Sequence, residues 1–201
     1  MPKEAGNMKK IVIATKNQGK LREMRAALAM LPVEIVPLDA SLPDAVEDGT
    51  TFEENARKKA HFYAQATHCA VIADDSGLEV AALGGVPGVH SARFAGHHGD
   101  DTANNEKLVR ELMARGRNES PADYRCALVF EDTDGTAIVA DGRCDGTVRT
   151  VPRGTGGFGY DPYFYLDEKS MAELTPTEKD AVSHRGKALR ALVRELEVYL
   201  A

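Results

Sequence analysis

The chain is poor in several residue types, and each shortage excludes a class of protein. Its 201 residues include no tryptophan, and aromatic residues make up only 6%. The three cysteines (Cys69, Cys126 and Cys144) share no C-x-x-C spacing, which argues against a zinc knuckle and for a reducing compartment. We expect each of them to be a small buried residue.

Long apolar runs and an excess of basic charge are also missing. No run is long enough for a membrane-spanning helix, and residues 1–7 lack the apolar stretch of a signal peptide. A net charge of −6 disfavours a broad nucleic-acid-binding surface. We therefore expect a cytoplasmic location, no membrane association and no nucleic-acid partner.

What is present fits one globular protein. Hydrophobic residues make up 43% and charged residues 28%, which is ordinary for a chain that buries a core without disulfides or structural metal. We expect residues 1–7 to be a disordered N-terminal extension, with Met8 as a candidate start. Residues 8–201 should then form a single two-lobed domain.

Strand and helix patterns alternate in the first half of the chain, and a hairpin pattern follows. Short apolar runs predict strands at 10–14 and 33–38, and a buried strand from residue 71 that leads into Asp74-Asp75. Helices are predicted after residue 20, from near Phe52, over 102–113 and from about residue 183. Asp134-Gly135 between two β-rich runs predicts an antiparallel hairpin. The expected architecture is an α/β fold with a mixed β-sheet flanked by helices and divided into two lobes.

A polar loop at residues 15–20 joins the first strand to the first helix. Its Gly19, Lys16 and Lys20 accompany a helix N-terminus, which can bind an anion. The G-x-x-x-x-G-K-[ST] order of a P-loop is absent. An ordinary turn with Thr15 or Asn17 as the helix cap is the alternative.

The stretch 71–80 places two adjacent carboxylates, Asp74 and Asp75, after an apolar strand. We predict that the strand ends there and that the backbone turns at Ser76-Gly77. Carboxylates outside a strand end are where open α/β folds place their chemistry. A polar turn capped by Asp and Ser is the alternative.

Thr51 followed by Glu54 predicts a capping box, and the helix that it opens carries Asn55 and Lys59 on one face. A solvated charged face is the alternative interpretation of Lys59.

Glycine is frequent in residues 83–96, which excludes a regular helix or a long strand there. We interpret the polar residues that follow as solvated rather than as metal ligands, because adjacent histidines point apart. These residues are His97, His98, Asp100 and Asp101.

Residues 154–164 combine four glycines with aromatic residues, which is typical of a wall against which a ligand ring lies. A glycine-rich turn is the alternative. Residues 173–179 are predicted to form a proline-containing turn. His184 and Arg185 open the last helix, where the helix dipole disfavours cations, and this conflict favours a functional role for them.

Six segments, in order along the chain, together resemble the noncanonical purine nucleoside triphosphate pyrophosphatases, the inosine triphosphatase family. They are residues 14–20, 51–56, 73–78, 87–94, 156–162 and 183–186. The resemblance implies hydrolysis of ITP, dITP and XTP to the nucleoside monophosphate and pyrophosphate with Mg²⁺, which removes them from the nucleotide pool. It also implies an elongated mixed sheet, two lobes with an active-site cleft between them, and a homodimer.

By motif position, the resemblance also assigns residues. The triphosphate would contact Thr15, Lys16, Asn17, Gln18, Gly19, Lys20 and Lys59. The base side of the substrate would contact Ser76, Phe158, Gly159, Tyr160, Asp161, Lys179, His184 and Arg185. Asp75 would be the catalytic base, and Asp75, Asp74 and Glu47 would be the metal ligands.

Two other functions compete with this one. A Maf-like nucleotide pyrophosphatase of other base specificity would share the metal chemistry. A non-catalytic nucleotide sensor would bind without releasing pyrophosphate, but such a protein does not need an Asp-Asp pair beside its phosphate loop.

Overall fold

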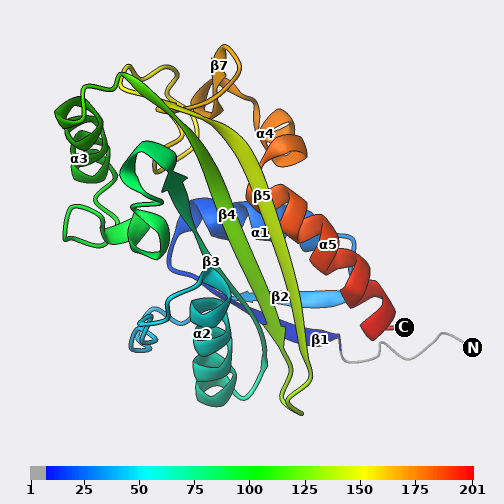
Figure 1. Cartoon of the computed structure of the whole chain (residues 1–201). Helices are drawn as coiled ribbons and strands as arrows, with labels where there is room; N and C mark the ends of the chain where they lie inside the picture. Colours follow the sequence, from blue (N-terminus) through cyan, green and yellow to red (C-terminus); the bar gives the residue numbers. More distant parts are fainter. Residues whose placement is uncertain (1–7) are drawn as a thin grey trace, which may run out of the picture. The chain divides into compact units, whose positions relative to one another are not determined.

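The computed structural model describes residues 8–201 (Figure 1), so the extension expected at residues 1–7 lies outside the described part. The chain divides into two compact units. The first unit holds the residues up to Asp75 together with Ala127–Ala140 and Ala188–Ala201. The second unit holds Ser76–Cys126 and Asp141–Lys187.

Seven strands form one mixed sheet, in the order β2-β1-β3-β4-β5-β6-β7. The strands are β1 (Lys9–Ala14), β2 (Val33–Pro37), β3 (Ala70–Val80), β4 (Glu119–Glu131), β5 (Ala137–Arg149), β6 (Phe164–Leu166) and β7 (Lys169–Ser170). β1 pairs in parallel with β2 and β3, whereas β6 pairs antiparallel with β5 and β7. The prediction of a mixed sheet is confirmed.

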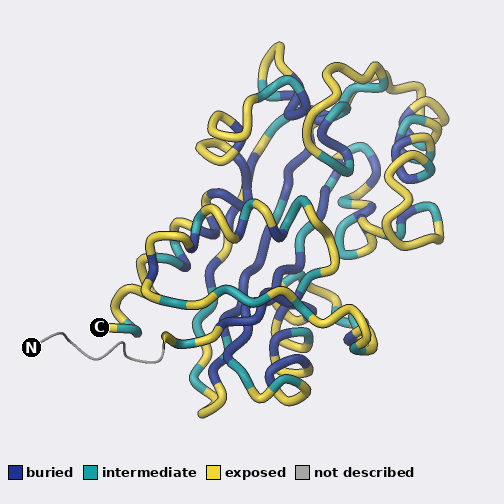
Figure 2. The backbone as a smooth tube through the Cα atoms, turned by 180° about the vertical axis from the view of Figure 1, so that it is seen from behind, coloured by how far each residue is buried: buried dark blue, intermediate teal, exposed yellow. Residues whose placement is uncertain are grey.

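The helices flank this sheet, and most of them begin where the sequence predicts. They are α1 (Gln18–Leu28), α2 (Phe52–Thr67), α3 (Asp101–Ala114), α4 (Pro176–Val182) and α5 (His184–Tyr199), with short 3₁₀ helices at Ala81–Leu83, Gly88–Arg93 and Met171–Glu173. Figure 2 shows buried strands beside helices that keep an exposed side. None of the helices in residues 8–201 is long and apolar enough to cross a membrane.

The first unit has its own apolar core between β1, β3 and α2. Val12, Val71 and Ala60 belong to it and are almost fully buried. β1 and β3 are parallel and pair Ala14 with Ala73, so the residues that follow Ala14 lie next to those that follow Ala73. This register places the polar loop at residues 15–20 beside Asp74.

Two helix caps in the first unit follow the predicted chemistry only in part. The Asn17 side chain accepts a hydrogen bond from the Lys20 N–H at 3.0 Å, and Thr51 accepts one from the Glu54 N–H at 3.1 Å. The Glu54 carboxylate, however, accepts from the N–H of Thr50 instead of the capping residue. The capping box predicted here is therefore only half formed.

The second unit has a separate core that includes Leu78, Leu108 and Phe164. The path of β3 into this unit corrects a prediction. The strand does not turn at Ser76-Gly77 but continues to Val80. The physical reason is burial, since Leu78 and Val80 are 0% exposed within this core. The Leu78 N–H also donates to the Ser91 hydroxyl at 2.9 Å.

A second correction concerns residues 173–179, which contain a helix start rather than a simple turn. Thr175 caps α4, Pro176 is its first residue, and Glu178 completes a capping box. Proline suits the first helical position because no intrahelical hydrogen bond is lost there. The sequence holds this signal in the order Thr175, Pro176 and Glu178.

The hairpin of β4 and β5 is as predicted, with Gly135 in its turn at φ +87°. The two strands are the longest of the sheet and lie side by side in Figure 1. Of the three cysteines, Cys126 and Cys144 are buried as expected, whereas Cys69 is only half-buried.

Candidate active site

A cluster of charged side chains lies in the first unit, where β1 ends beside the middle of β3. We call it the carboxylate–lysine cluster; it consists of Lys20, Glu47, Lys59, Asp74 and Asp75. The Lys20 ammonium donates to the Asp74 carboxylate. The Lys59 ammonium lies 2.9 Å from Glu47 Oε1 and donates to the Asp74 backbone carbonyl at 3.1 Å.

Burial shapes the charges of this cluster. Asp75 is 6% exposed, and burial raises its pKa to about 6, although Lys59 and Lys20 act in the opposite direction. Burial would lower the pKa of Lys59, but the charges of Glu47 and Asp75 hold it above its ordinary value. The cluster therefore keeps two cations beside a carboxyl group whose proton is exchangeable near neutral pH.

Asn55 supports this cluster from α2. It is fully buried, its amide oxygen accepts from the Gly49 N–H at 2.7 Å, and its nearby amide lowers the pKa of Asp75. The contact with Gly49 ties the segment that carries Glu47 to the same helix as Lys59. The interpretation of Lys59 as a solvated residue is wrong, because its side chain is only 13% exposed.

The loop at residues 15–20 presents the start of α1 to the same cluster. The first N–H groups of a helix have no intrahelical partner, so those of Gln18 and Gly19 suit an anion. Lys20 points to Asp74, whereas Lys16 points to Asp44 at 2.8 Å and to the Leu42 carbonyl at 3.2 Å. Of the two lysines in this loop, the structure places Lys20 in the carboxylate–lysine cluster and Lys16 outside it.

The three carboxylates predicted as metal ligands form no ready-made metal site. In the described residues, no group of three or more His, Cys, Asp or Glu side chains could hold a metal ion. Asp74 and Glu47 instead pair with lysines, and Asp75 lies close enough to Glu47 for the charge of Glu47 to raise its pKa. This donor set fits an ion held by one or two carboxylates and completed by ligand oxygens and water, as Mg²⁺ often is.

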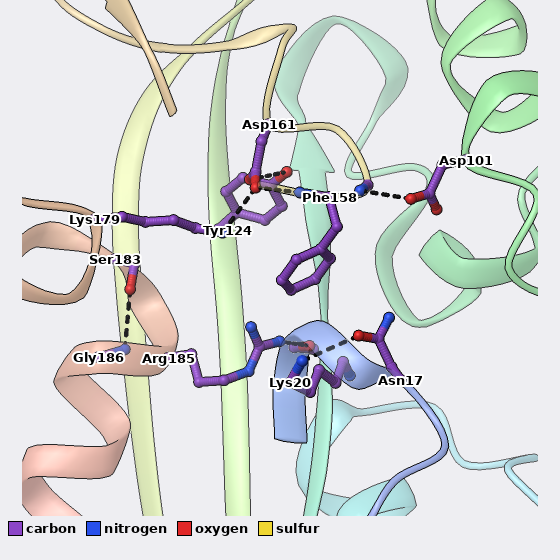
Figure 3. Close-up of polar contacts among 12 residues, drawn as sticks. Asn17, Lys20, Asp101, Tyr124, Phe158, Asp161, Lys179, Ser183, Arg185 and Gly186 are labelled. Atoms are coloured by element: carbon purple, nitrogen blue, oxygen red, sulfur yellow. Dashed lines mark hydrogen bonds and ion pairs between the residues drawn. The ribbon is translucent and has the colours of Figure 1, made fainter. Parts of the chain in front are cut away.

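A second group of predicted residues lies in the second unit, around residues 157–161, which we call the Phe158 loop (Figure 3). Asp161 Oδ2 accepts from the Phe158 N–H at 2.9 Å and from the Lys179 ammonium at 2.7 Å. A Cβ on Gly157, which has φ +73°, would overlap this carboxylate. The ammonium of Lys179 lies 4.4 Å from the centre of the Phe158 ring.

Arg185 approaches the Phe158 ring from the start of α5. It is 2% exposed, its Nη2 donates to the Ser76 hydroxyl at 2.8 Å, and its guanidinium carbon lies 5.6 Å from the ring centre. A cation within about 6 Å of an aromatic ring is attracted to its face. The unfavourable dipole at this position is thus offset by two specific contacts.

His184 does not face the Phe158 ring but stacks on Tyr124 of β4. The ring centres are 4.6 Å apart and the planes differ by 12°. The Tyr124 hydroxyl donates to Asp161 Oδ1 at 3.5 Å, and burial together with Asp161 raises the pKa of Tyr124. Tyr160 is also turned away from solvent, since it is 5% exposed and donates to the Ser91 carbonyl at 2.7 Å.

Three residues in the second unit contact predicted site residues although the sequence did not single them out for this role. Tyr124 is one of them. The others are Asp101, whose carboxylate accepts from the Gly159 N–H at 2.8 Å, and Asn105, which donates to the Gly159 carbonyl at 2.9 Å. Asp101 is exposed as predicted, but it is also bound to the loop. Only the tertiary fold brings these residues to Gly159, so no local pattern marks them.

Comparison with known proteins shows the family to which the chain belongs. The model of the Ham1 family matches residues 11–195. A dITP/XTP pyrophosphatase of Geobacillus kaustophilus is 50% identical over 94% of this chain and 95% of its own. One of Syntrophobacter fumaroxidans is 48% identical over 94% and 83%.

Among solved structures, a HAM1 protein from Coxiella burnetii superposes with a TM-score of 0.85. It is 39% identical and covers 94% of this chain and 99% of its own. Both the family match and these identities extend over nearly the whole described sequence. The chain belongs to the Ham1 family.

Proposed function

We propose that this protein hydrolyses the noncanonical purine nucleoside triphosphates ITP, dITP and XTP to the nucleoside monophosphate and pyrophosphate, and so removes them from the nucleotide pool. Membership of a family whose relatives are named dITP/XTP pyrophosphatase supports the reaction. The observation that carries the proposal is Asp75, a buried carboxylate between two lysines with a pKa of about 6.

The first unit supplies groups for the triphosphate. Lys20 and Lys59 provide cations, and the start of α1 provides backbone N–H groups from Gln18 and Gly19. Fixed cations and N–H groups stabilise the charge that develops on phosphate oxygens during transfer. In our proposal, the triphosphate also contacts Thr15, Lys16 and Asn17 of this loop.

Asp75 acts as the general base. A carboxyl group with a pKa of about 6 is mostly ionised at neutral pH and can accept a proton from an attacking water. Burial makes the carboxylate more basic, and Lys20 and Lys59 keep it from becoming fully protonated. Such a base contributes typically ~10²–10⁴-fold to the rate.

Mg²⁺ is the cofactor that we propose, with Asp75, Asp74 and Glu47 as the residues that would hold it. When bound, the ion would neutralise charge on the phosphate oxygens. Asp74 and Glu47 now pair with Lys20 and Lys59. With the ion held by these carboxylates, Lys20 and Lys59 would contact phosphate oxygens.

The second unit supplies groups for the base. The Phe158 ring offers a flat face, and Lys179 and Arg185 are donors beside it. Hypoxanthine and xanthine present a 6-keto acceptor to such donors, whereas adenine presents a 6-amino donor. A site whose buried polar groups are left unpaired by the wrong base can discriminate by ~10⁴-fold. Gly159, Tyr160 and Asp161 would shape this side of the site, and Ser76 and His184 would complete it.

The resemblance to the inosine triphosphatases further supports a homodimer, and the reducing compartment that the cysteines indicate supports a cytoplasmic location. The mass of the protein in solution, measured by light scattering, tests the dimer. A monomeric mass at micromolar concentration would contradict it.

A substrate panel tests the proposed function. Pyrophosphate release is measured with Mg²⁺ from ITP, dITP and XTP, and in parallel from ATP, GTP and dTTP. We expect the first three to be hydrolysed with much higher kcat/KM. Equal or greater turnover of the standard nucleotides would contradict the proposal, as would tight binding without pyrophosphate release.

A further inference from the structure

Two side chains of α3, Asp101 and Asn105, hold one residue of the Phe158 loop from both sides of its backbone. Asp101 Oδ2 accepts from the Gly159 N–H at 2.8 Å, and Asn105 Nδ2 donates to the Gly159 carbonyl at 2.9 Å. They are four residues apart in a helix, so they project from the same face. Figure 3 shows the Asp101 carboxylate directed at the loop backbone.

The hydrogen bonds of Asp101 and Asn105 fix the orientation of the two peptide groups that follow Phe158. A peptide group is planar, so the conformation of a residue follows from the orientation of the two peptide planes that flank it. The plane before Phe158 is held by Asp161, which accepts from the Phe158 N–H, and the plane after it is held by Asp101. Asn105 then holds the plane after Gly159, which has φ +62°. With both flanking planes held, the direction in which the Phe158 side chain leaves the backbone is set.

Packing and stability alone do not explain why Asp101 and Asn105 carry polar side chains. Asn105 is 9% exposed, and in the described residues its amide oxygen is buried without a hydrogen-bond partner. Burying an unpaired polar atom carries a desolvation cost that an apolar side chain would avoid. Asp101 is exposed, so its hydrogen bond to Gly159 adds little to global stability.

We infer that Asp101 and Asn105 are positioning residues for base recognition: they hold the Phe158 loop so that its ring meets the purine base. The inference rests on the proposed role of Phe158 in binding the base. Neither residue touches substrate in this scheme, and both act through Gly159 on the neighbouring aromatic ring.

The neighbouring residue Asn104 provides a matched control on the same helix. It is also buried, at 2% exposed, and its amide makes the same kind of backbone contacts, to the Ala95 N–H at 2.7 Å and to the Ala92 carbonyl at 3.3 Å. It anchors a different segment, so it tests what the loss of a buried amide on α3 does by itself.

The experiment measures kcat and KM for ITP and ATP in Asp101→Ala, Asn105→Ala, Asp101→Asn and Asn104→Ala. We expect Asp101→Ala and Asn105→Ala each to lower kcat/KM for ITP about tenfold, mainly through KM, and to reduce the preference for ITP over ATP. Asp101→Asn keeps an oxygen acceptor and should retain the preference. Asn104→Ala should lower the melting temperature without changing the preference.

A double-mutant cycle with Phe158→Ala separates this inference from the proposed function. If Asp101 acts through the ring, Asp101→Ala has no further effect on the ITP preference once the ring is removed. An unchanged preference for ITP over ATP in Asp101→Ala would overturn the inference. A double mutant in which the effects of Asp101→Ala and Phe158→Ala on this preference multiply would also overturn it. An unchanged preference in Phe158→Ala alone would instead overturn the assignment of the base site.

Discussion

Replacing Asp75 by Asn should stabilise the protein at alkaline pH while abolishing its turnover. The pKa of Asp75 is about 6 in the folded protein, against about 3.9 for an aspartate in an unfolded chain. One pKa unit corresponds to 1.36 kcal/mol, so ionised Asp75 costs about 3 kcal/mol of folding free energy. Asn is neutral at every pH and has nearly the same shape.

The sign of the effect follows from proton binding. Because the folded-state pKa is raised, the folded state holds the proton more tightly than the unfolded state between about pH 4 and pH 6. The contribution of Asp75 to the free energy of unfolding is fully present below about pH 4 and is lost as the pH rises through about 6. Asp75→Asn should therefore gain about 3 kcal/mol over wild type at pH 8 and little at pH 4, or roughly 6–12 °C in melting temperature at the higher pH.

Thermal unfolding in buffer with EDTA measures this difference, since a bound cation would lower the pKa of the same carboxyl group. Asp141→Asn, at an exposed position of β5, is the control for the same substitution made outside the cluster. The same Asp75→Asn protein should hydrolyse ITP ~10²–10⁴-fold more slowly while binding it with similar affinity. Equal melting temperatures at pH 8, or near-normal turnover, would refute the reasoning about this carboxylate.

Three other substitutions test other parts of the structure. Arg185→Ala should reduce base discrimination more than phosphate affinity, and an unchanged ratio of kcat/KM for ITP and ATP would count against this role. Gly157→Ala places a methyl group against Asp161 at φ +73° and should reduce kcat/KM for ITP, whereas a kinetically normal variant would show that the loop adapts. Asp132→Asn removes the charged partner of Lys9 and should cost ~2 kcal/mol in urea unfolding at pH 7. Burial would raise the pKa of Asp132, but the hydrogen bonds from Lys9, Tyr199 and the Thr133 N–H together hold it below its ordinary value. The loss should therefore shrink as the pH falls through the folded-state pKa, and a pH-independent loss would contradict the ion pair.

The sequence predicted most elements because their signals are local. Asn17 as a helix cap, the hairpin around Gly135 and the apolar stripe of α5 all depend on residues within one or two turns of each other. The prediction of a turn at Ser76-Gly77 is wrong for a non-local reason. Ser and Gly favour a turn, but Leu78 and Val80 are drawn into the core of the second unit, so the strand continues.

The candidate site was predictable as a set of residues but not as a set of contacts. The motifs identified Lys20, Lys59 and Asp75, whereas the pairing of Lys59 with Glu47 depends on the fold. The support given to Gly159 by Asp101 depends on a contact between residues 58 positions apart. No periodicity or spacing encodes such a contact, which is why the sequence indicates only a solvated role for Asp101.

The products of ITP hydrolysis test the central claim most directly. Wild-type protein is incubated with ITP and Mg²⁺, and the nucleotide and phosphate products are separated by ion-exchange chromatography. The account predicts IMP and pyrophosphate in equal amounts, with neither product formed at a comparable rate by Asp75→Asn. Release of IDP and orthophosphate, or no turnover of ITP by the wild-type protein, would contradict it.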